Sequence, residues 1–110
     1  MVVTEEDVHN AVEYLRKTAT PLGRMRAEQI KTEKMISHVE ALMTIASEQK
    51  SAEMRKADAR ASSRYVEAID AHAQAAGEFE ALKAGREAAS AVIEAWRTQS
   101  ATHRAMTRVA

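Results

Sequence analysis

Apolar positions recur at steps of three and four along the second half of the chain, which predicts one long helix from Ser62 to about Met106. This segment has no proline and only two glycines. Its stripe consists of Tyr65, Ile69, His72, Ala76, Phe79, Leu82, Arg86, Ala89, Ile93 and Trp96. At ~1.5 Å per residue, such a helix is about 65 Å long and cannot bury its stripe alone. The rest of the chain or a second copy must therefore cover it.

A second helical pattern runs from Pro21 to about Glu48 with the seven-residue alternation of a coiled coil. Its stripe consists of Leu22, Met25, Gln29, Thr32, Ile36, Val39, Met43 and Ala46. A short connection makes two long helices antiparallel neighbours. We therefore expect Ile36, Val39 and Met43 to face the Tyr65–Leu82 part of the long helix.

The ends of the remaining elements follow from capping residues. Thr4 precedes three acids and predicts the start of an N-terminal helix. Thr20-Pro21 predicts a break or a sharp kink, because proline lacks an amide donor and clashes one turn back. Ser51 is positioned to cap a short helix over Ala52 to Arg60, and Ser62 to cap the long one. One continuous helix from Ser51 is the alternative.

The expected fold is therefore all-α: residues 1–110 form a single helical domain, an elongated antiparallel helical hairpin or coiled-coil bundle with an additional N-terminal helix. The composition agrees, since alanine, glutamate, lysine and arginine abound while aromatic residues, glycine and proline are scarce. Alanine favours helix but buries little area, which predicts a shallow core.

Other features limit the chemistry. The chain has no cysteine, which excludes disulfides and thiolate metal sites. No apolar run approaches the ~20 residues that span a bilayer, and the N-terminus lacks a signal-peptide pattern, so we expect a cytoplasmic protein without membrane contact. The four histidines are far apart, and no phosphate loop or nucleophile motif is present. We therefore expect that the protein is not an enzyme and binds no cofactor or metal. We expect His72 to pack against neighbouring side chains.

The C-terminal segment carries the most suggestive chemistry. The formal charge of the chain is zero, but after Glu94 there are no acids. Trp96 could stack a base while Arg97, Arg104 and Arg108 hold phosphates, which would make a nucleic-acid-binding site. Trp96 could equally anchor the end of the bundle, with the arginines favouring the negative end of the helix.

Two or three helices this rich in alanine leave their larger residues partly uncovered, so we expect a homo-oligomer. The core or oligomer face consists of Ile36, Val39, Met43, Tyr65, Ile69, Phe79, Leu82 and Ile93.

Three short pieces, Tyr14–Ala19, Ser62–Tyr65 and Ile93–Ala101, resemble a family of small helical proteins from tailed phages and prophages. Many members are encoded near recombination and replication genes. The resemblance implies a location in the bacterial host and an accessory role in phage DNA metabolism, with no catalytic residues to carry over.

Two functions follow as hypotheses. The first is an accessory protein in DNA recombination or replication that binds single-stranded DNA or a recombination or repair protein, without catalysis. The second is a structural or adaptor coiled-coil oligomer, or a small inhibitor of a host protein, with no nucleic-acid contact.

Overall fold

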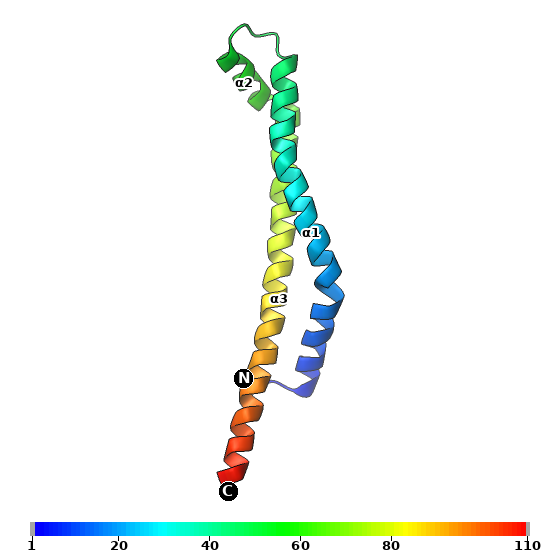
Figure 1. The fold of residues 1–110 in the computed structure, drawn as a ribbon, viewed down its shortest axis with the longest axis vertical. Helices are drawn as coiled ribbons and strands as arrows, with labels where there is room; N and C mark the ends of the chain where they lie inside the picture. The colour runs from blue at the N-terminus through cyan, green and yellow to red at the C-terminus, as the bar shows by residue number, and fades with distance from the viewer. Residues whose placement is uncertain (1, 110) are drawn as a thin grey trace. The chain divides into compact units, whose positions relative to one another are not determined.

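The computed structural model describes residues 2–109 and contains three α-helices (Figure 1). They are α1 (Glu5–Ala46), α2 (Ala52–Ala61) and α3 (Ser63–Val109). No strand occurs in the described residues. The fold class is all-α, an antiparallel helical hairpin, and this prediction from the sequence is confirmed.

Contacts divide the chain into two compact units. The first contains the chain up to Leu22 and from Ala81 onward, and the second contains Gly23–Glu80. Both long helices are continuous through the two units. Within each unit α1 and α3 pair in antiparallel fashion, since early residues of α1 meet late residues of α3.

The seam between the two long helices follows a strict heptad spacing of three and four. Every seam residue is buried or half-buried. On α1 these residues are Val8, Ala11, Leu15, Thr18 and Leu22 in the first unit, then Met25, Gln29, Thr32, Ile36, Val39 and Met43 in the second. On α3 they are Tyr65, Ala68, His72, Ala75 and Phe79 in the second unit, then Leu82, Arg86, Ala89, Ile93 and Trp96 in the first.

The seam on α3 differs from the expected stripe at two positions. Ala68 and Ala75 are buried, whereas Ile69 is 40% exposed and Ala76 only half-buried. The sequence pattern favoured the larger side chain at the first step, but a heptad seam requires a step of three after Tyr65. Alanine at these positions lets the two helices approach closely, and Ile69 lies outside the seam.

Of the break or sharp kink expected at Thr20-Pro21, the break is wrong, because α1 continues as a helix through Pro21. The heptad spacing is the same before and after the proline, with Leu15 and Thr18 on one side and Leu22 and Met25 on the other. Seam packing on both sides therefore stabilises the helix despite the missing amide donor. The expected N-terminal helix is thus the first part of α1, and the third helix of the fold is α2.

The predicted caps are confirmed. The Thr4 hydroxyl accepts from the amide of Asp7 (3.1 Å), and an Asp7 carboxylate oxygen accepts from the amide of Thr4 (2.9 Å). Ser51 caps α2 by accepting from the Met54 amide (3.1 Å). Ser62 has extended backbone angles and accepts from the Tyr65 amide (3.3 Å), so α2 and α3 are separate helices. The alternative of one continuous helix from Ser51 is wrong.

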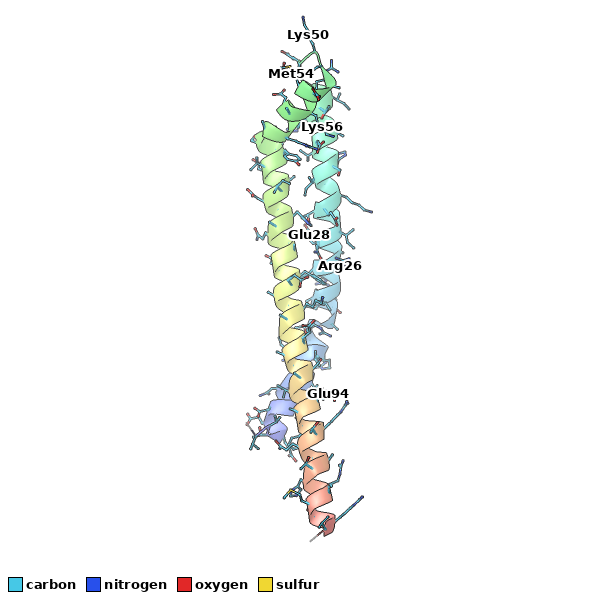
Figure 2. The ribbon with its side chains drawn as sticks, turned by 90° about the vertical axis from the view of Figure 1, so that its left-hand side faces the viewer. Arg26, Glu28, Lys50, Met54, Lys56 and Glu94 are labelled. Carbon is cyan, nitrogen blue, oxygen red and sulfur yellow. The ribbon has the colours of Figure 1, made fainter. Side chains whose placement is uncertain are left out.

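Polar contacts in the second unit hold α2 beside the end of α1. Glu40 of α1 pairs with Lys56 (3.9 Å), which Figure 2 labels on α2, and with Arg60 (3.5 Å). The Ser47 hydroxyl donates to a carboxylate oxygen of Asp58 (2.8 Å). On the apolar side Ala59 is 1% exposed. The short helix is therefore a packed element of this unit.

The buried core is thin. In the described residues the buried apolar positions are Val3 and five alanines, and no large side chain is fully buried. Large seam residues such as Phe79 and Trp96 are only half-buried. Two helices cover at most one side of each other, so the seam alone cannot enclose a large side chain.

Candidate functional site

Trp96 and the three arginines of the C-terminal segment lie on different sides of α3. Trp96 is half-buried at a seam position, in heptad register with Ala89 and Ile93. Arg97, Arg104 and Arg108 are all exposed, and their spacing of seven and four places them together on one side of the helix. The seam is about 100° away from Arg97. The arginines therefore form a basic row without an aromatic surface in its centre.

The members of this basic row are not equivalent. A guanidinium nitrogen of Arg97 lies 2.6 Å from a carboxylate oxygen of Glu94, which Figure 2 labels on α3. Arg104 and Arg108 make no ion pair within the described residues. Both follow the last acid of the chain, so their charges are available to an anionic partner.

At two places along the seam, a polar side chain of α3 contacts a threonine of α1. We call each such pair a polar layer, and the two layers have similar hydrogen bonds. In the first unit, one Arg86 guanidinium nitrogen donates to the Leu15 carbonyl and to the Thr18 hydroxyl, both at 2.6 Å. Thr18 donates its own proton back to the Tyr14 carbonyl (2.7 Å). The threonine hydroxyl thus accepts from α3 while it donates to α1, which satisfies the polar groups of this layer.

The second unit repeats this arrangement two heptads away on both helices. The Thr32 hydroxyl lies 3.1 Å from His72 Nδ1 and 2.8 Å from the Glu28 carbonyl. The hydroxyl has a single proton, so the direction of its bond with His72 depends on the tautomer of the imidazole: Nδ1 donates where the hydroxyl proton points to the carbonyl, and accepts where that proton points to Nδ1. No buried side-chain polar atom of the described residues lacks a partner. His72 is therefore a packing residue with one satisfied ring nitrogen, as expected from the sequence.

The two polar residues that interrupt the α3 stripe thus face two threonines of α1. Both interruptions are evident in the sequence, but their partners were not predicted. The sequence does contain a signal for these pairs, because the separation in sequence between Thr18 and Thr32 equals that between His72 and Arg86. In an antiparallel pair, equal distances on the two helices bring both layers into contact in one register.

The expected core or oligomer face lies mostly on the seam. Ile36, Val39 and Met43 are half-buried on α1. Tyr65, Phe79, Leu82 and Ile93 are half-buried on α3. The Arg26 guanidinium, labelled in Figure 2, lies 5.6 Å from the centre of the Phe79 ring and covers part of it.

The described residues contain no group of three metal-ligating side chains. None of the three helices has the long apolar stretch needed to cross a bilayer within the described range. The clearest electrostatic effect on a titrating group belongs to an exposed pair on α1, where a hydrogen bond and the charge of Arg16 lower the pKa of Glu13. A single exposed pair of this kind indicates a solvated helix surface, not a reaction centre.

No family model, no curated protein and no solved structure matches this chain.

Proposed function

We propose that this chain is a non-catalytic adaptor that binds a partner protein by helix-to-helix contact. The observation that supports this proposal is a row of large apolar side chains on the part of α1 in the second unit. Met35 is 39% exposed, Leu42 46% and Ile45 80%. Exposed apolar residues that gather on one side of a helix indicate an interaction surface, whereas scattered ones do not.

These three residues share one side of α1 that is separate from the seam. Met35 and Leu42 are one heptad apart, and Ile45 follows three residues later. Ile45 also lines a hollow of 530 Å³ between α1 and α2, together with Ala41 and Ala52. Ile45 belongs to both the row and the hollow, and we call Met35, Leu42 and Ile45 the Leu42 strip.

The occupant that fits the Leu42 strip is an amphipathic helix of another protein. Such helices present apolar residues at spacings of three, four and seven, which match those of the strip. Glu40 and Lys56 also line the hollow and provide polar contacts at its margin. The resemblance to phage proteins extends the proposal to a recombination or repair protein of a phage or its host as the partner.

The test is a pull-down from phage-infected cells with a photo-crosslinking residue beside the Leu42 strip. We expect one specific partner protein that binds the wild-type chain but does not bind the double variant Leu42→Asp/Ile45→Asp. The matched control is Val66→Asp, because Val66 is an exposed apolar residue on α3 (51%). A partner that binds the double variant as well as wild type would refute the strip as its site.

A second candidate function is contact with single-stranded nucleic acid through Arg97, Arg104 and Arg108. It is favoured by the exposed, acid-free basic row at the end of α3. Trp96, which the sequence offered either as a base-stacking surface or as an anchor of the bundle, lies at the seam, which favours the role in stability. Removal of one arginine that binds a phosphate should reduce the salt slope of single-strand binding by about 0.7.

The nucleic-acid proposal is tested by fluorescence anisotropy with a labelled oligonucleotide over a range of salt concentrations. We expect Arg104→Ala to reduce the salt slope and Trp96→Ala to lower the free energy of unfolding with little change in that slope. The control is Arg64→Ala, an exposed arginine at the other end of α3. Lack of binding by wild type at low salt would refute this function.

A further inference from the structure

A second heptad row runs along α1 in the second unit, beside the seam. Each of its residues up to Leu42 precedes a seam residue by one position, so the row has the same alternating steps of four and three. At ~1.5 Å per residue the row is about 32 Å long, which corresponds to about three heptads. We call it the outer row, and it contains the Leu42 strip. All of its residues are exposed, and they are Arg24, Glu28, Lys31, Met35, His38, Leu42 and Ile45.

The spacing of the outer row suits one further helix along α1. Alternating steps of three and four are the geometry by which one long helix packs along another, and the seam already uses this geometry to bind α3. A displacement of one residue turns the side chain by about 100° around the helix. The outer row therefore points away from α3, which explains why every position in it is exposed although the neighbouring seam is covered.

The charges of α1 are sorted around the outer row. Lys31 belongs to the row, and Lys34 lies one turn farther along, at its margin. The two acids between Lys31 and Ile45 are Glu33 and Glu40. Each of them is two residues away from a row position, which places it about 200° around the helix. From Lys31 to Ile45 the outer row therefore presents cations and apolar side chains, and the acids lie on the other side of α1.

The two lysines are available to an anionic partner. Neither Lys31 nor Lys34 makes an ion pair within the part of the chain that the structure describes. The one acid of the outer row is Glu28, and Arg24 balances its charge one turn earlier in the same row. The row as a whole thus carries a positive charge beside an apolar end.

The acids of α3 determine at which margin of the row a negative partner fits. Lys34 is two residues before the seam residue Ile36, so it lies about 200° from the seam, on the side of α1 that faces away from α3. Carboxylates of a partner are attracted to this margin and repelled from the seam side. In the second unit α3 has one arginine and four exposed acids, which are Glu67, Asp70, Glu78 and Glu80.

His38 lies in the middle of the outer row, one turn from Met35 and one turn from Leu42. Its imidazole has at least one N–H donor in either protonation state, so it can donate to a carboxylate of a helix that covers the row. An apolar side chain over His38 would bury this donor without a partner, which is unfavourable. The position of His38 therefore also favours an acidic occupant.

We propose that the partner of the Leu42 strip is an acidic amphipathic helix of about three heptads. Apolar side chains of this helix pack on the Leu42 strip, and its carboxylates lie beside Lys31, Lys34 and His38. This inference rests on the proposed function, because it names the class of partner that the same surface binds. A basic helix is excluded, since both lysines repel it.

Two synthetic peptides test the charge of the partner. Both are amphipathic helices of about 22 residues with leucine at the heptad positions, and they differ only in having glutamate or lysine at the flanking positions. Fluorescence anisotropy of the labelled peptide measures the affinity of the full chain for each. We expect the glutamate peptide to bind about tenfold more tightly than the lysine peptide, with a preference that weakens as salt rises. Equal affinity for the two peptides, or binding of neither, would overturn the proposal.

Charge reversal on the chain locates the contact. We expect Lys31→Glu/Lys34→Glu to weaken binding of the glutamate peptide about tenfold and to strengthen binding of the lysine peptide. Arg104→Glu/Arg108→Glu is the matched control, because it changes the net charge equally in the first unit and should leave the preference unchanged. Circular dichroism confirms that each variant remains helical. A Lys31→Glu/Lys34→Glu chain that keeps the wild-type preference would also refute the acidic partner.

The double variant Leu42→Asp/Ile45→Asp separates this proposal from the proposed function. We expect it to lose the glutamate peptide as well as the cellular partner, because both need the apolar end of the outer row. If it loses the cellular partner while the wild-type chain binds both peptides equally, the adaptor function stands and the acidic class of partner is wrong. If the wild-type chain prefers the glutamate peptide but retains no cellular partner, the chemistry of the outer row stands and the adaptor function is wrong.

Discussion

At the scale of single residues, the polar layers show how a thin core tolerates polar side chains. Thr18 donates to a carbonyl of its own helix and accepts from Arg86, and Thr32 contacts both a carbonyl of its own helix and His72. Replacing a buried polar pair with apolar residues is often neutral for stability, whereas removing one partner leaves the other unsatisfied. These layers therefore fix which residues of the two helices lie opposite each other, since any shift by a heptad would separate the partners.

The first prediction concerns the energy that couples Thr18 to Arg86. In a double-mutant cycle with Thr18→Val and Arg86→Met, we expect a coupling energy of about 1–3 kcal/mol, because the hydrogen bond has a charged donor. Urea unfolding of the four proteins gives this value. The same cycle with Thr18→Val and Lys83→Met is the control, since Lys83 is an exposed residue of the same unit. A coupling no larger than in the control would show that the layer does not set the register.

The second prediction concerns two glycines of α3. A Cβ at Gly77 meets no atom within 4 Å, so Gly77→Ala should raise the free energy of unfolding by about 1 kcal/mol. Gly85→Ala should give a smaller gain, because the Tyr14 hydroxyl must move away. In a Tyr14→Phe background the gain at Gly85 should increase, since the closest contact is then absent. Thermal unfolding measures these differences, and equal gains at both glycines in wild type would contradict the packing at Gly85.

At the scale of helices, the sequence pattern predicted most of the fold because heptad spacing is a strong local signal. The α1 seam from Leu22 to Met43, the α2 helix and the Ser62 cap all follow from spacing and capping residues. The choice between Ala68 and Ile69 did not follow, because both spacings are helical and only the pairing with α1 selects one. Trp96 belongs to the stripe with either choice, so its place at the seam followed from the sequence pattern.

Pro21 shows the other limit of local reasoning. An internal proline disfavours a helix by about 3 kcal/mol, and the unbroken heptad spacing from Leu15 to Met25 was the one local sign that the helix continues. The compensation comes from seam residues on α3, which are distant in sequence.

The third prediction follows from this cost. Pro21→Ala should raise the free energy of unfolding by up to about 3 kcal/mol, because alanine restores the amide donor and removes the clash with the preceding turn. Guanidinium unfolding is a suitable measurement. Thr20→Ala is the control, since Thr20 is an exposed neighbour for which helix propensity alone predicts a gain below about 0.7 kcal/mol. If the two variants behave alike, the proline is not a destabilising element of α1.

At the scale of the whole chain, the small apolar area buried within one copy affects both its stability and its tendency to bind other chains. The only buried apolar residues in the described range are Val3 and five alanines, so the apolar area that stabilises one copy is small. Residues that a single copy leaves exposed, such as Met106 and Leu42, are then available to a second copy or to another protein. This low burial also explains why the fold class could be predicted from the sequence while the partner could not. The spacing and charge of an exposed helix surface can be read from the sequence, but they do not identify the molecule that binds there.

The last prediction is that the thermal stability of the chain depends on its concentration. If two copies unfold together, each tenfold rise in concentration stabilises the folded form by about 1.4 kcal/mol, which is ~5 °C in Tm for a domain of this size. Differential scanning calorimetry over a hundredfold range of concentration measures this slope. A Tm that stays constant over the whole range, with reversible unfolding, would mean that one chain folds alone and that the thin seam is sufficient for its stability.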